Sequence, residues 1–469
     1  MSLPDNPNLE HLRHEARALQ RAVRAGDAAA LARAGRIAGP GPEPYPLHLA
    51  QLVVARGYGF ASWARLKRYV DMATEHAWQP LAEPAEESLP DRFCRWACLT
   101  YADGDGPDRW ERARALLPEI GGDVWASAAA GRADAVRDAL GRDPGLARAK
   151  GGPYGFTPLC YLAYSRVVDG DAQATARALL EAGADPDEGH LWNGQPYPFT
   201  ILTGLFGNGE LGPARQPPHP HVAALARLVL DAGADPNDSQ TLYNRMFSSD
   251  DSHLTLLFEY GLGRGDGGPW RRRLGDRIGS PAELLRSQLR WAVEHGMVER
   301  VRLLVAHGVD VVEAYPDGRT PMDLARLGAF DTIAEILVEG GSPPAELDDV
   351  DELIAALFAG STINVHVAGE AIRRRPGLIV WAAARGRADV VAKLVELGWD
   401  VNARGRGDVP LEQEWHTALH EAAGNNDLPM IEMLLSLGAD PAVRDARFHA
   451  TPLEWARHFD HREAVRSLA

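Results

Sequence analysis

The residues with the clearest catalytic potential lie close together near the C-terminus. His416 and His420 are four residues apart, so a helix would place both imidazoles on one side, and Glu421 follows directly. Two histidines and a glutamate at helical spacing are typical of zinc hydrolases. In that motif the glutamate lies between the histidines, whereas here it follows them. We therefore favour a structural role for these three residues and expect no catalytic site.

Other groups of metal-binding residue types are incomplete. His219 and His221 lie in a proline-rich stretch without a third ligand nearby, and zinc sites use three or four protein ligands. Cys94 and Cys98 are four residues apart on an expected helix, and Cys160 is remote in the sequence. We expect no metal site at either place and predict that the thiols are buried.

An acidic stretch resembles the beginning of a calcium-binding loop. Asp103, Asp105 and Asp108 have suitable spacing, but the twelfth position counted from Asp103 is Arg114 instead of the glutamate that such loops use. A turn followed by a helix cap is the better interpretation. The chain also lacks a nucleophile motif, a P-loop and a dinucleotide fingerprint, since residues 263–268 (GRGDGG) have no Lys-Ser/Thr ending. We expect no cofactor.

Aromatic and arginine side chains in irregular turns are the best candidates for binding a partner, because these residue types anchor many protein interfaces. Trp270 precedes three arginines in an otherwise acidic chain. Two interpretations stay open for this segment: an anchor for a partner, or a solvated loop held by one buried tryptophan. The candidate partner-binding residues are Trp192, Tyr197, His219, His221, Trp270, Arg271, Arg272, Arg273, Trp399, Arg404, Arg406 and Trp415.

The elements that must position these side chains are visible in two recurring phrases. Leu-Leu-x-x-Gly-Ala-Asp-Pro occurs with small changes at 179–186, 229–236 and 434–441, and more weakly at 304–311 and 394–401. Thr-Pro-Leu or a close variant begins at Thr157, Thr320, Thr417 and Thr451. Similarity at a short fixed period determines the whole architecture of a chain.

Each phrase has a physical meaning at a helix end. A threonine hydroxyl can accept a hydrogen bond from a free amide of the first turn, and proline is tolerated just inside it. A glycine after the last turn can adopt the left-handed conformation that closes a helix. We expect that conformation at Gly183, Gly233, Gly308, Gly398 and Gly438. Two short amphipathic helices lie between the phrases, and stacking buries their apolar faces.

The phrases and the helix pair resemble the ankyrin repeat, a β-turn and two helices of about 33 residues. The resemblance is strong from about Asp123 onward, over roughly nine units, and it extends weakly to the N-terminus. It implies an all-α solenoid with a concave groove and projecting turns. It also implies that His420 supports a turn by hydrogen bonds. Trp291, Trp381 and Trp455 share one position of the unit, which predicts a common place in the core.

Breaks in the repeat pattern suggest four regions. Residues 1–77 form a divergent N-terminal helical cap, and 78–122 contain a proline-rich acidic linker followed by a divergent helix pair. Residues 123–345 form the repeat array with long irregular turns, and 346–469 form the C-terminal repeats. Long segments in repeat proteins commonly project on the binding face.

Composition limits the possible partners and compartments. The net charge of −16 argues against nucleic acid as the main partner and favours a protein with a basic surface. Three cysteines in 469 residues indicate a reducing compartment, and neither a signal peptide nor a membrane-spanning stretch is visible. Lysine is scarce relative to arginine, which together with abundant Ala, Gly and Pro predicts a GC-rich bacterial genome. We expect a cytoplasmic bacterial protein of unknown oligomeric state.

The expected function is non-enzymatic binding of a partner protein through the concave groove and the long turns. Fold resemblance alone does not establish a function, so two alternatives stay open. An enzyme acting on a small molecule would need a compact pocket with convergent polar groups. An inhibitor or immunity protein for a specific toxin or enzyme would differ only in the identity of its partner.

Overall fold

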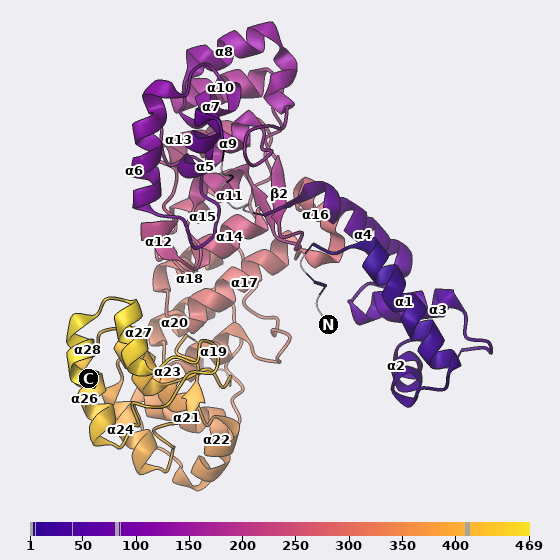
Figure 1. The fold of residues 1–469 in the computed structure, drawn as a ribbon. Coiled ribbons are helices and arrows are strands. Elements are labelled where there is room, and N and C mark those ends of the chain that lie inside the picture. Colours follow the sequence, from indigo (N-terminus) through magenta and orange to yellow (C-terminus); the bar gives the residue numbers. More distant parts are fainter. Residues whose placement is uncertain (1–2, 5, 40, 80–83, 85, 409–412) are drawn as a thin grey trace. The chain divides into compact units, whose positions relative to one another are not determined.

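The computed structural model describes residues 3–469 except 5, 40, 80–83, 85 and 409–412, and it is mostly helical, as predicted (Figure 1). The chain divides into two compact units, Met1–Leu284 and Leu285–Ala469. Part of the predicted linker at 78–90 lies outside the described residues. Among the helices that are described, none has the length and apolar character needed to cross a membrane.

Four helices begin the first unit: α1 (Leu9–Arg24), α2 (Ala28–Ala38), α3 (Leu47–Gly57) and α4 (Trp63–His76). Their apolar faces meet in a common core, because the buried positions recur at helical spacing. In α1 these positions are Leu12, Ala16, Leu19 and Val23. The core also includes residues from a later segment, which is described below.

The rest of the first unit consists of stacked helix pairs. The first helices of the pairs are α5 (Leu89–Ala97), α7 (Val124–Ala129), α9 (Pro158–Tyr164), α11 (Ile201–Phe206) and α14 (Ser239–Met246). The second helices are α6 (Pro107–Leu116), α8 (Ala133–Arg142), α10 (Ala172–Glu181), α13 (Val222–Asp231) and α15 (Ser252–Glu259). First helices pack on first helices along the series, and α8, α10 and α13 pack likewise (Figure 1). Neighbouring pairs therefore share each apolar surface, as the repeat pattern predicts.

Short irregular elements interrupt these pairs. They are α12 (Gly212–Arg215), α16 (Gly268–Leu274) and the 3-10 turns η1 (Leu117–Glu119), η2 (Pro144–Arg148) and η3 (Gly275–Arg277). A small sheet is formed by β1 (Ala77–Trp78), β2 (Gly189–Trp192) and β3 (Pro198–Thr200). Strand β1 pairs in parallel with β2, and β2 and β3 form an antiparallel hairpin. The chain that leaves α4 is thereby attached to a turn of the repeat array.

The second unit contains further helix pairs. They are α17 (Pro281–Glu294, which contains the boundary between the units) with α18 (Val298–Ala306), α19 (Pro321–Leu327) with α20 (Asp331–Glu339), and α21 (Asp349–Ala359) with α22 (Ala368–Arg374). Then follow α23 (Leu378–Ala384) with α24 (Ala388–Glu396), α25 (Ala418–Gly424) with α26 (Leu428–Ser436), and α27 (Pro452–His458) with α28 (Arg462–Leu468).

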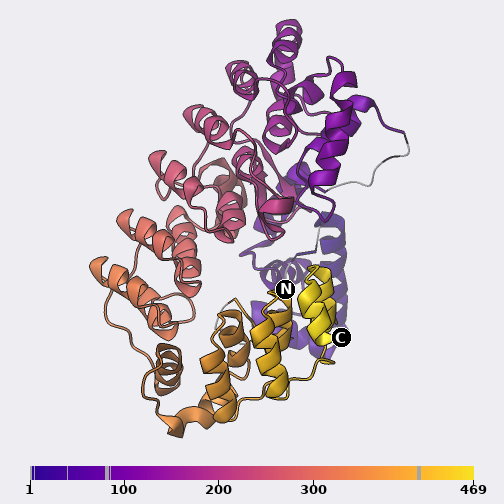
Figure 2. The same cartoon turned by 90° about the vertical axis from the view of Figure 1, so that its left-hand side faces the viewer.

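Within this unit α23, α25 and α27 pack side by side, which Figure 2 shows in orange and yellow. A continuous apolar core runs beneath them from Leu327 to Ala464. A 3-10 turn, η4 (Val365–Val367), precedes α22, and the strands β4 (Arg404–Gly405) and β5 (His416–Thr417) form a short hairpin before α25. The loop between β4 and β5 includes residues 409–412, which are not described.

The helix ends follow the predicted backbone chemistry at most positions of the two phrases. All five glycines of the first phrase have φ between 75° and 103°, which confirms the left-handed conformation. Thr320 and Thr451 accept hydrogen bonds from amides of the first turn, as predicted, and each forms a reciprocal capping box. Thr157 begins α9 without such a bond, since its hydroxyl has no hydrogen-bond partner among the described residues.

The three tryptophans that share one position of the repeat unit are buried to different extents. Trp381 is 2% exposed and packs against Phe358 with ring centres 4.4 Å apart, which confirms its place in the core. Trp291 and Trp455 are only half-buried. Trp455 lies against His416 and donates a hydrogen bond from its indole to the carboxylate of Asp445. The three tryptophans therefore occupy the same position of the repeat unit, but only Trp381 is fully within the core.

Candidate protein-binding surface

Helix α16 places Trp270 inside the first unit. The indole is 6% exposed and joins the core of α1 to α4 together with Leu274 and Ile278. Its Nε1 donates a hydrogen bond to the carbonyl of Asp187 at 2.9 Å, and its ring lies 5.2 Å from that of His76. The buried indole holds α16 in place and offers almost no surface to a partner.

The arginines after Trp270 lie in the last turn of α16, where cations stabilise the carboxyl end of a helix. Arg272 forms an ion pair with Asp266 at 2.8 Å. Arg273 lies 4.9 Å from the ring centre of Trp270, and Arg271 donates to the carbonyl of Asp266 at 3.2 Å. Arg272 and Arg273 are exposed, so their guanidinium groups stay accessible to a partner.

The two histidines of the proline-rich stretch have different environments. His219 is 1% exposed, and its Nδ1 accepts a hydrogen bond from the amide of His221 at 3.0 Å. Burial, reinforced by the positive charge of Arg166, lowers the pKa of His219 well below its ordinary value. The ring of His221 is exposed. Among the described residues, no group of three or more His, Cys, Asp or Glu side chains is placed to hold a metal ion.

Two further candidate tryptophans use their indole nitrogens within their own units. Trp192 is half-buried and donates to the carbonyl of Thr100 at 3.2 Å. Trp399 is 3% exposed and donates to the carbonyl of Arg375 at 2.8 Å. Both bonds join segments that are distant in sequence. An indole N–H that is removed from water needs such a partner.

Tyr197, by contrast, lies at the exposed tip of the hairpin β2–β3. Its side chain is 55% exposed. Tyr243 on α14 and Phe247 directly after this helix are also exposed, with their rings 5.2 Å apart in an edge-to-face arrangement. The hydroxyl of Tyr243 donates to Glu210 at 2.6 Å. Burial, Glu210 and the neighbouring Tyr197 together raise the pKa of Tyr243. We call Tyr197, Tyr243 and Phe247 the aromatic patch.

The acidic segment forms a turn, as predicted, but the predicted helix cap is wrong, because Gly106 is the N-cap of α6 and no side chain caps that helix. Asp105 is 2% exposed and accepts hydrogen bonds from the amides of Thr100 and Tyr101. Arg109 donates to the same carboxylate at 2.7 Å. Burial raises the pKa of Asp105, although these donors oppose the effect. All three cysteines are free and buried, as predicted.

In the second unit, two successive loops present the remaining candidates. We call them fingers: the first finger carries β4 and β5, and the second is the loop 445–450. The amide of Ala446 donates to the carbonyl of Trp415 at 2.8 Å. Arg404 on the first finger donates to the carbonyl of Arg444, next to the second, at 2.7 Å. The two fingers are thereby joined to each other.

Cations and aromatic rings alternate where the fingers meet. The guanidinium of Arg447 lies 5.3 Å from the ring centre of Trp415 and 5.2 Å from that of Phe448. Arg406 lies 6.0 Å from the same Trp415 ring. Phe448 is 62% exposed, which is unusual for a phenylalanine. We define the finger surface as the side chains of Arg404, Arg406, Trp415, Arg444, Arg447 and Phe448.

One buried carboxylate fixes the second finger. Oδ1 of Asp445 accepts hydrogen bonds from the amides of Arg447 and Phe448 at 2.8 and 2.6 Å. Oδ2 accepts from the amide of Ala450 at 3.0 Å and from the indole of Trp455 at 3.1 Å. Burial alone would raise the pKa of Asp445, but these donors outweigh it and the pKa is lowered. The loop that carries Arg447 and Phe448 is therefore ordered by the protein itself.

The C-terminal histidines belong to this scaffold. His420 is fully buried, and its Nδ1 accepts a hydrogen bond from the amide of Thr417 while Nε2 lies 2.9 Å from the carbonyl of Ala450. This arrangement confirms that His420 supports a turn. His416 lies 2.7 Å from the carboxylate of Glu421. The ring nitrogens thus serve to hold the fingers in place on α25.

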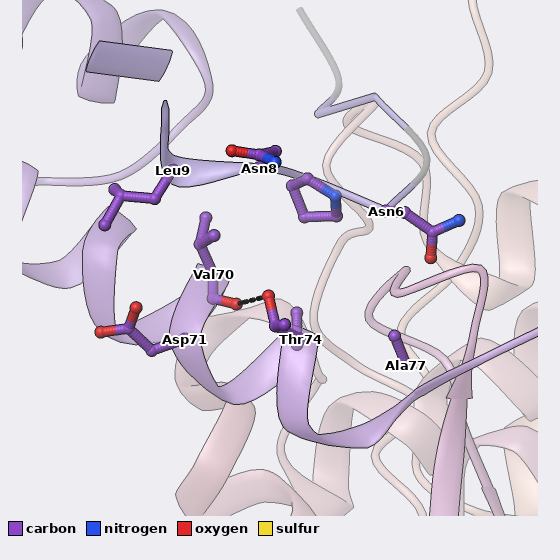
Figure 3. A pocket seen from close by; sticks show the side chains of 9 residues that line it. Asn6, Asn8, Leu9, Val70, Asp71, Thr74 and Ala77 are labelled. Atoms are coloured by element: carbon purple, nitrogen blue, oxygen red, sulfur yellow. Dashed lines mark hydrogen bonds between the residues drawn. The ribbon is translucent and has the colours of Figure 1, made fainter. Parts of the chain in front are cut away.

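The N-terminal helices enclose a hollow of about 500 Å³ between the start of α1 and the end of α4 (Figure 3). Three of its polar side chains bond within the chain. Thr74 donates to the carbonyl of Val70 at 2.8 Å, and Asn8 accepts from an amide of the first turn of α1 at 2.7 Å. Asn6 donates to the side chain of Gln79 at 3.1 Å. These groups hold the hollow together and do not converge on its centre.

Comparison with known proteins assigns the last three helix pairs to a class. Residues 379–469 match the family model for ankyrin repeats, in three copies, and this stretch carries the pairs α23–α24, α25–α26 and α27–α28. The C-terminal region therefore consists of ankyrin repeats. Over 87 residues the chain is 39% identical to the palmitoyltransferase Hip14 of Drosophila melanogaster. The match covers 19% of this chain and only 13% of that protein.

Sequence reasoning missed part of the finger surface and of the aromatic patch. The missed residues are Arg444, Arg447, Phe448, Tyr243 and Phe247. A usable signal existed for the second finger, because its residues precede the helix start at Thr451 just as Trp415 precedes the helix start at Thr417. Turn position within the repeat therefore identifies Arg447 and Phe448. No comparable signal distinguishes Tyr243 and Phe247 from core residues, since both lie on or beside an amphipathic helix.

Proposed function

We propose that this protein is a non-enzymatic binding protein that captures a partner protein through the fingers of its C-terminal repeats. Three ankyrin repeats in 379–469 support this function, because ankyrin repeats generally mediate protein–protein interaction. Arginine and tryptophan are also the side chains that most often dominate interface energetics. The finger surface contains both types on one ordered scaffold.

The observation that carries the proposal is the ordered group formed by the half-buried Trp415 and the exposed side chains of Arg447 and Phe448. A phenylalanine that is 62% exposed gains nothing in the free protein from its apolar surface. The four hydrogen bonds to Asp445 nevertheless hold the loop in one shape. Binding to an ordered loop costs less conformational entropy than binding to a disordered one.

We further propose that exposed candidates in the first unit contribute a second contact area. These residues are Tyr197 of the aromatic patch, His221, and Arg272 and Arg273 at the end of α16. We also propose a cytoplasmic location in a bacterium: the free buried cysteines agree with a reducing environment, and the scarcity of lysine relative to arginine agrees with a GC-rich bacterial genome. Capture of a toxin or an enzyme would be one specific form of the same binding function.

Affinity capture from lysate of the source cells, followed by mass spectrometry, tests this function. The full chain is compared with the double variant Arg447→Glu, Phe448→Ala and with the control Arg462→Glu. Arg462 has the same charge but lies on α28, with 85% of its side chain exposed. We expect one or more proteins to be captured by the wild type and the control and lost from the double variant. Equal capture by all three would overturn the proposed role of the finger surface.

A further inference from the structure

The finger surface carries four arginines although the chain as a whole is strongly negative. Two of its acidic neighbours are engaged by arginines of the surface itself: Asp408 pairs with Arg406, and Glu454 lies 3.1 Å from Arg444. Asp445 is buried, and its carboxylate oxygens accept hydrogen bonds from amides of the second finger. The overall charge therefore gives no guide to the charge that this surface would attract, because contacts act over a few ångströms and salt screens distant charges.

Two guanidinium groups of the finger surface have no carboxylate partner among the residues that the structure describes. Arg404 donates to a carbonyl oxygen, that of Arg444. Arg447 has its planar group near the rings of Trp415 and Phe448. An aromatic ring that lies beside a guanidinium group forms no hydrogen bond with the N–H groups of that guanidinium, so they stay available to a partner. The surface thus offers unsatisfied donors that carry positive charge.

We infer that the finger surface recognises an acidic peptide segment of the partner, in which an aspartate or glutamate lies next to an apolar side chain. This inference rests on the proposed function and specifies its ligand. The carboxylate forms a bidentate pair with Arg447, whose plane is held by the neighbouring rings. The apolar neighbour covers the exposed ring of Phe448. The same chemistry disfavours a partner with a basic surface, which the net charge of the whole chain had suggested.

The geometry explains why both parts of the ligand are needed. An ion pair at an exposed site contributes little alone, since water solvates both charges. An apolar side chain packed on Phe448 excludes water from the edge of the guanidinium and strengthens the pair. Neither feature alone gives specificity. A carboxylate and an apolar group at adjacent positions match the spacing of Arg447 and Phe448 on one short loop.

Selection from a library of random dodecapeptides, displayed against the purified full chain, tests this inference. We expect the selected peptides to be enriched in Asp and Glu relative to the starting library. One selected peptide, synthesised and labelled, should bind about 10- to 100-fold more weakly to Arg447→Glu, and binding should weaken with added salt. Arg447→Lys keeps the charge but not the bidentate geometry and should fall between. Arg462→Glu is the charge-matched control and should bind like the wild type.

The outcomes separate this inference from the proposed function. Peptides that depend on Arg447 and Phe448 but show no excess of acidic residues overturn the acidic ligand and leave the binding function intact. Acidic peptides that bind Arg447→Glu as well as the wild type overturn the inference too. A selection without any peptide that depends on the finger surface does the same, and the capture experiment then decides the proposed function by itself.

Discussion

The indole nitrogen of Trp270 donates a hydrogen bond to the carbonyl oxygen of Asp187, 2.9 Å away, across 83 positions of sequence. Asp187 lies directly before the hairpin β2–β3, and Trp270 lies on α16 within the core of the N-terminal helices. Strand β1 joins the same hairpin by parallel pairing. Three segments that are remote in sequence therefore meet at one turn of the array (Figure 1).

We predict that Trp270→Ala destabilises the first unit by about 3–5 kcal/mol, the usual cost of removing a large buried aromatic side chain. Trp270→Phe keeps much of the packing and loses the hydrogen bond, so it should cost less. Urea unfolding followed by circular dichroism gives the free energies, and hydrogen exchange of the β2 amides localises the effect.

Arg272→Ala is the matched control in the same helix. Its ion pair with Asp266 is exposed on both sides, and such pairs contribute about 0–1 kcal/mol. A loss below about 1 kcal/mol for Trp270→Ala would show that the indole is dispensable and would return Trp270 to the partner-binding candidates.

We predict that Asp445→Asn weakens the second finger without touching the side chains that would contact a partner. The NH2 group of asparagine donates and cannot accept hydrogen bonds, so the two donors that face it lose their acceptor, at about 1–3 kcal/mol. Binding of a peptide selected on the finger surface should decrease although Arg447 and Phe448 remain. Calorimetric titration of that peptide measures this loss, and unchanged affinity would show that the loop needs no support from Asp445.

The sign of the pH dependence follows from the lowered pKa of Asp445. A carboxyl group whose folded pKa lies below its unfolded value stabilises the protein above the unfolded pKa, near 3.9. This contribution is complete at neutral pH and is lost as the pH falls through the folded pKa. Below about pH 4 the free energies of unfolding of the wild type and of Asp445→Asn should therefore become similar.

We predict that Gly405→Ala destabilises the second unit by about 1–3 kcal/mol, because strand β4 lies backbone to backbone against the start of α23. A β-carbon on Gly405 would be 2.5 Å from the carbonyl oxygen of Gly377 and 2.8 Å from its α-carbon. Thermal unfolding measures the change. Gly369→Ala is the opposite case, since the nearest atom is a flexible arginine nitrogen at 3.9 Å and alanine favours the helix. Equal effects of the two substitutions would contradict this contact.

The repeat phrases predicted the architecture well because they encode local backbone chemistry. The five glycines with positive φ and the capping threonines of α19 and α27 needed no knowledge of tertiary contacts. The same reasoning failed at Thr157, where the surrounding fold leaves the hydroxyl without a partner. Local sequence therefore predicts where a helix such as α9 begins, but not whether the hydroxyl of its first threonine accepts a capping hydrogen bond.

Candidate binding residues were harder to predict because exposure is a tertiary property. Trp270 and Trp399 lie beside irregular turns and next to arginines or glycines, yet each buries its indole and donates to a distant carbonyl. Phe448 looks like a core residue by type and is 62% exposed. The partners that decide these cases are remote in sequence: Asp187 is 83 positions from Trp270. Composition and spacing carry no information about them.

The last prediction concerns His420, which joins the helix start of α25 to the second finger. Burial lowers its pKa from 6.5 to about 4, with a smaller opposing effect of the carbonyl of Ala450. The unfolded chain therefore binds a proton between these values while the folded chain does not. Stability should decrease as the pH falls from about 6.5 to about 4, by roughly 3 kcal/mol at most. His420→Gln removes the titration, so its unfolding free energy should depend less on pH in this window. Urea unfolding at pH 7 and pH 4.5 compares the two proteins, and parallel losses would show that His420 is not the group that titrates.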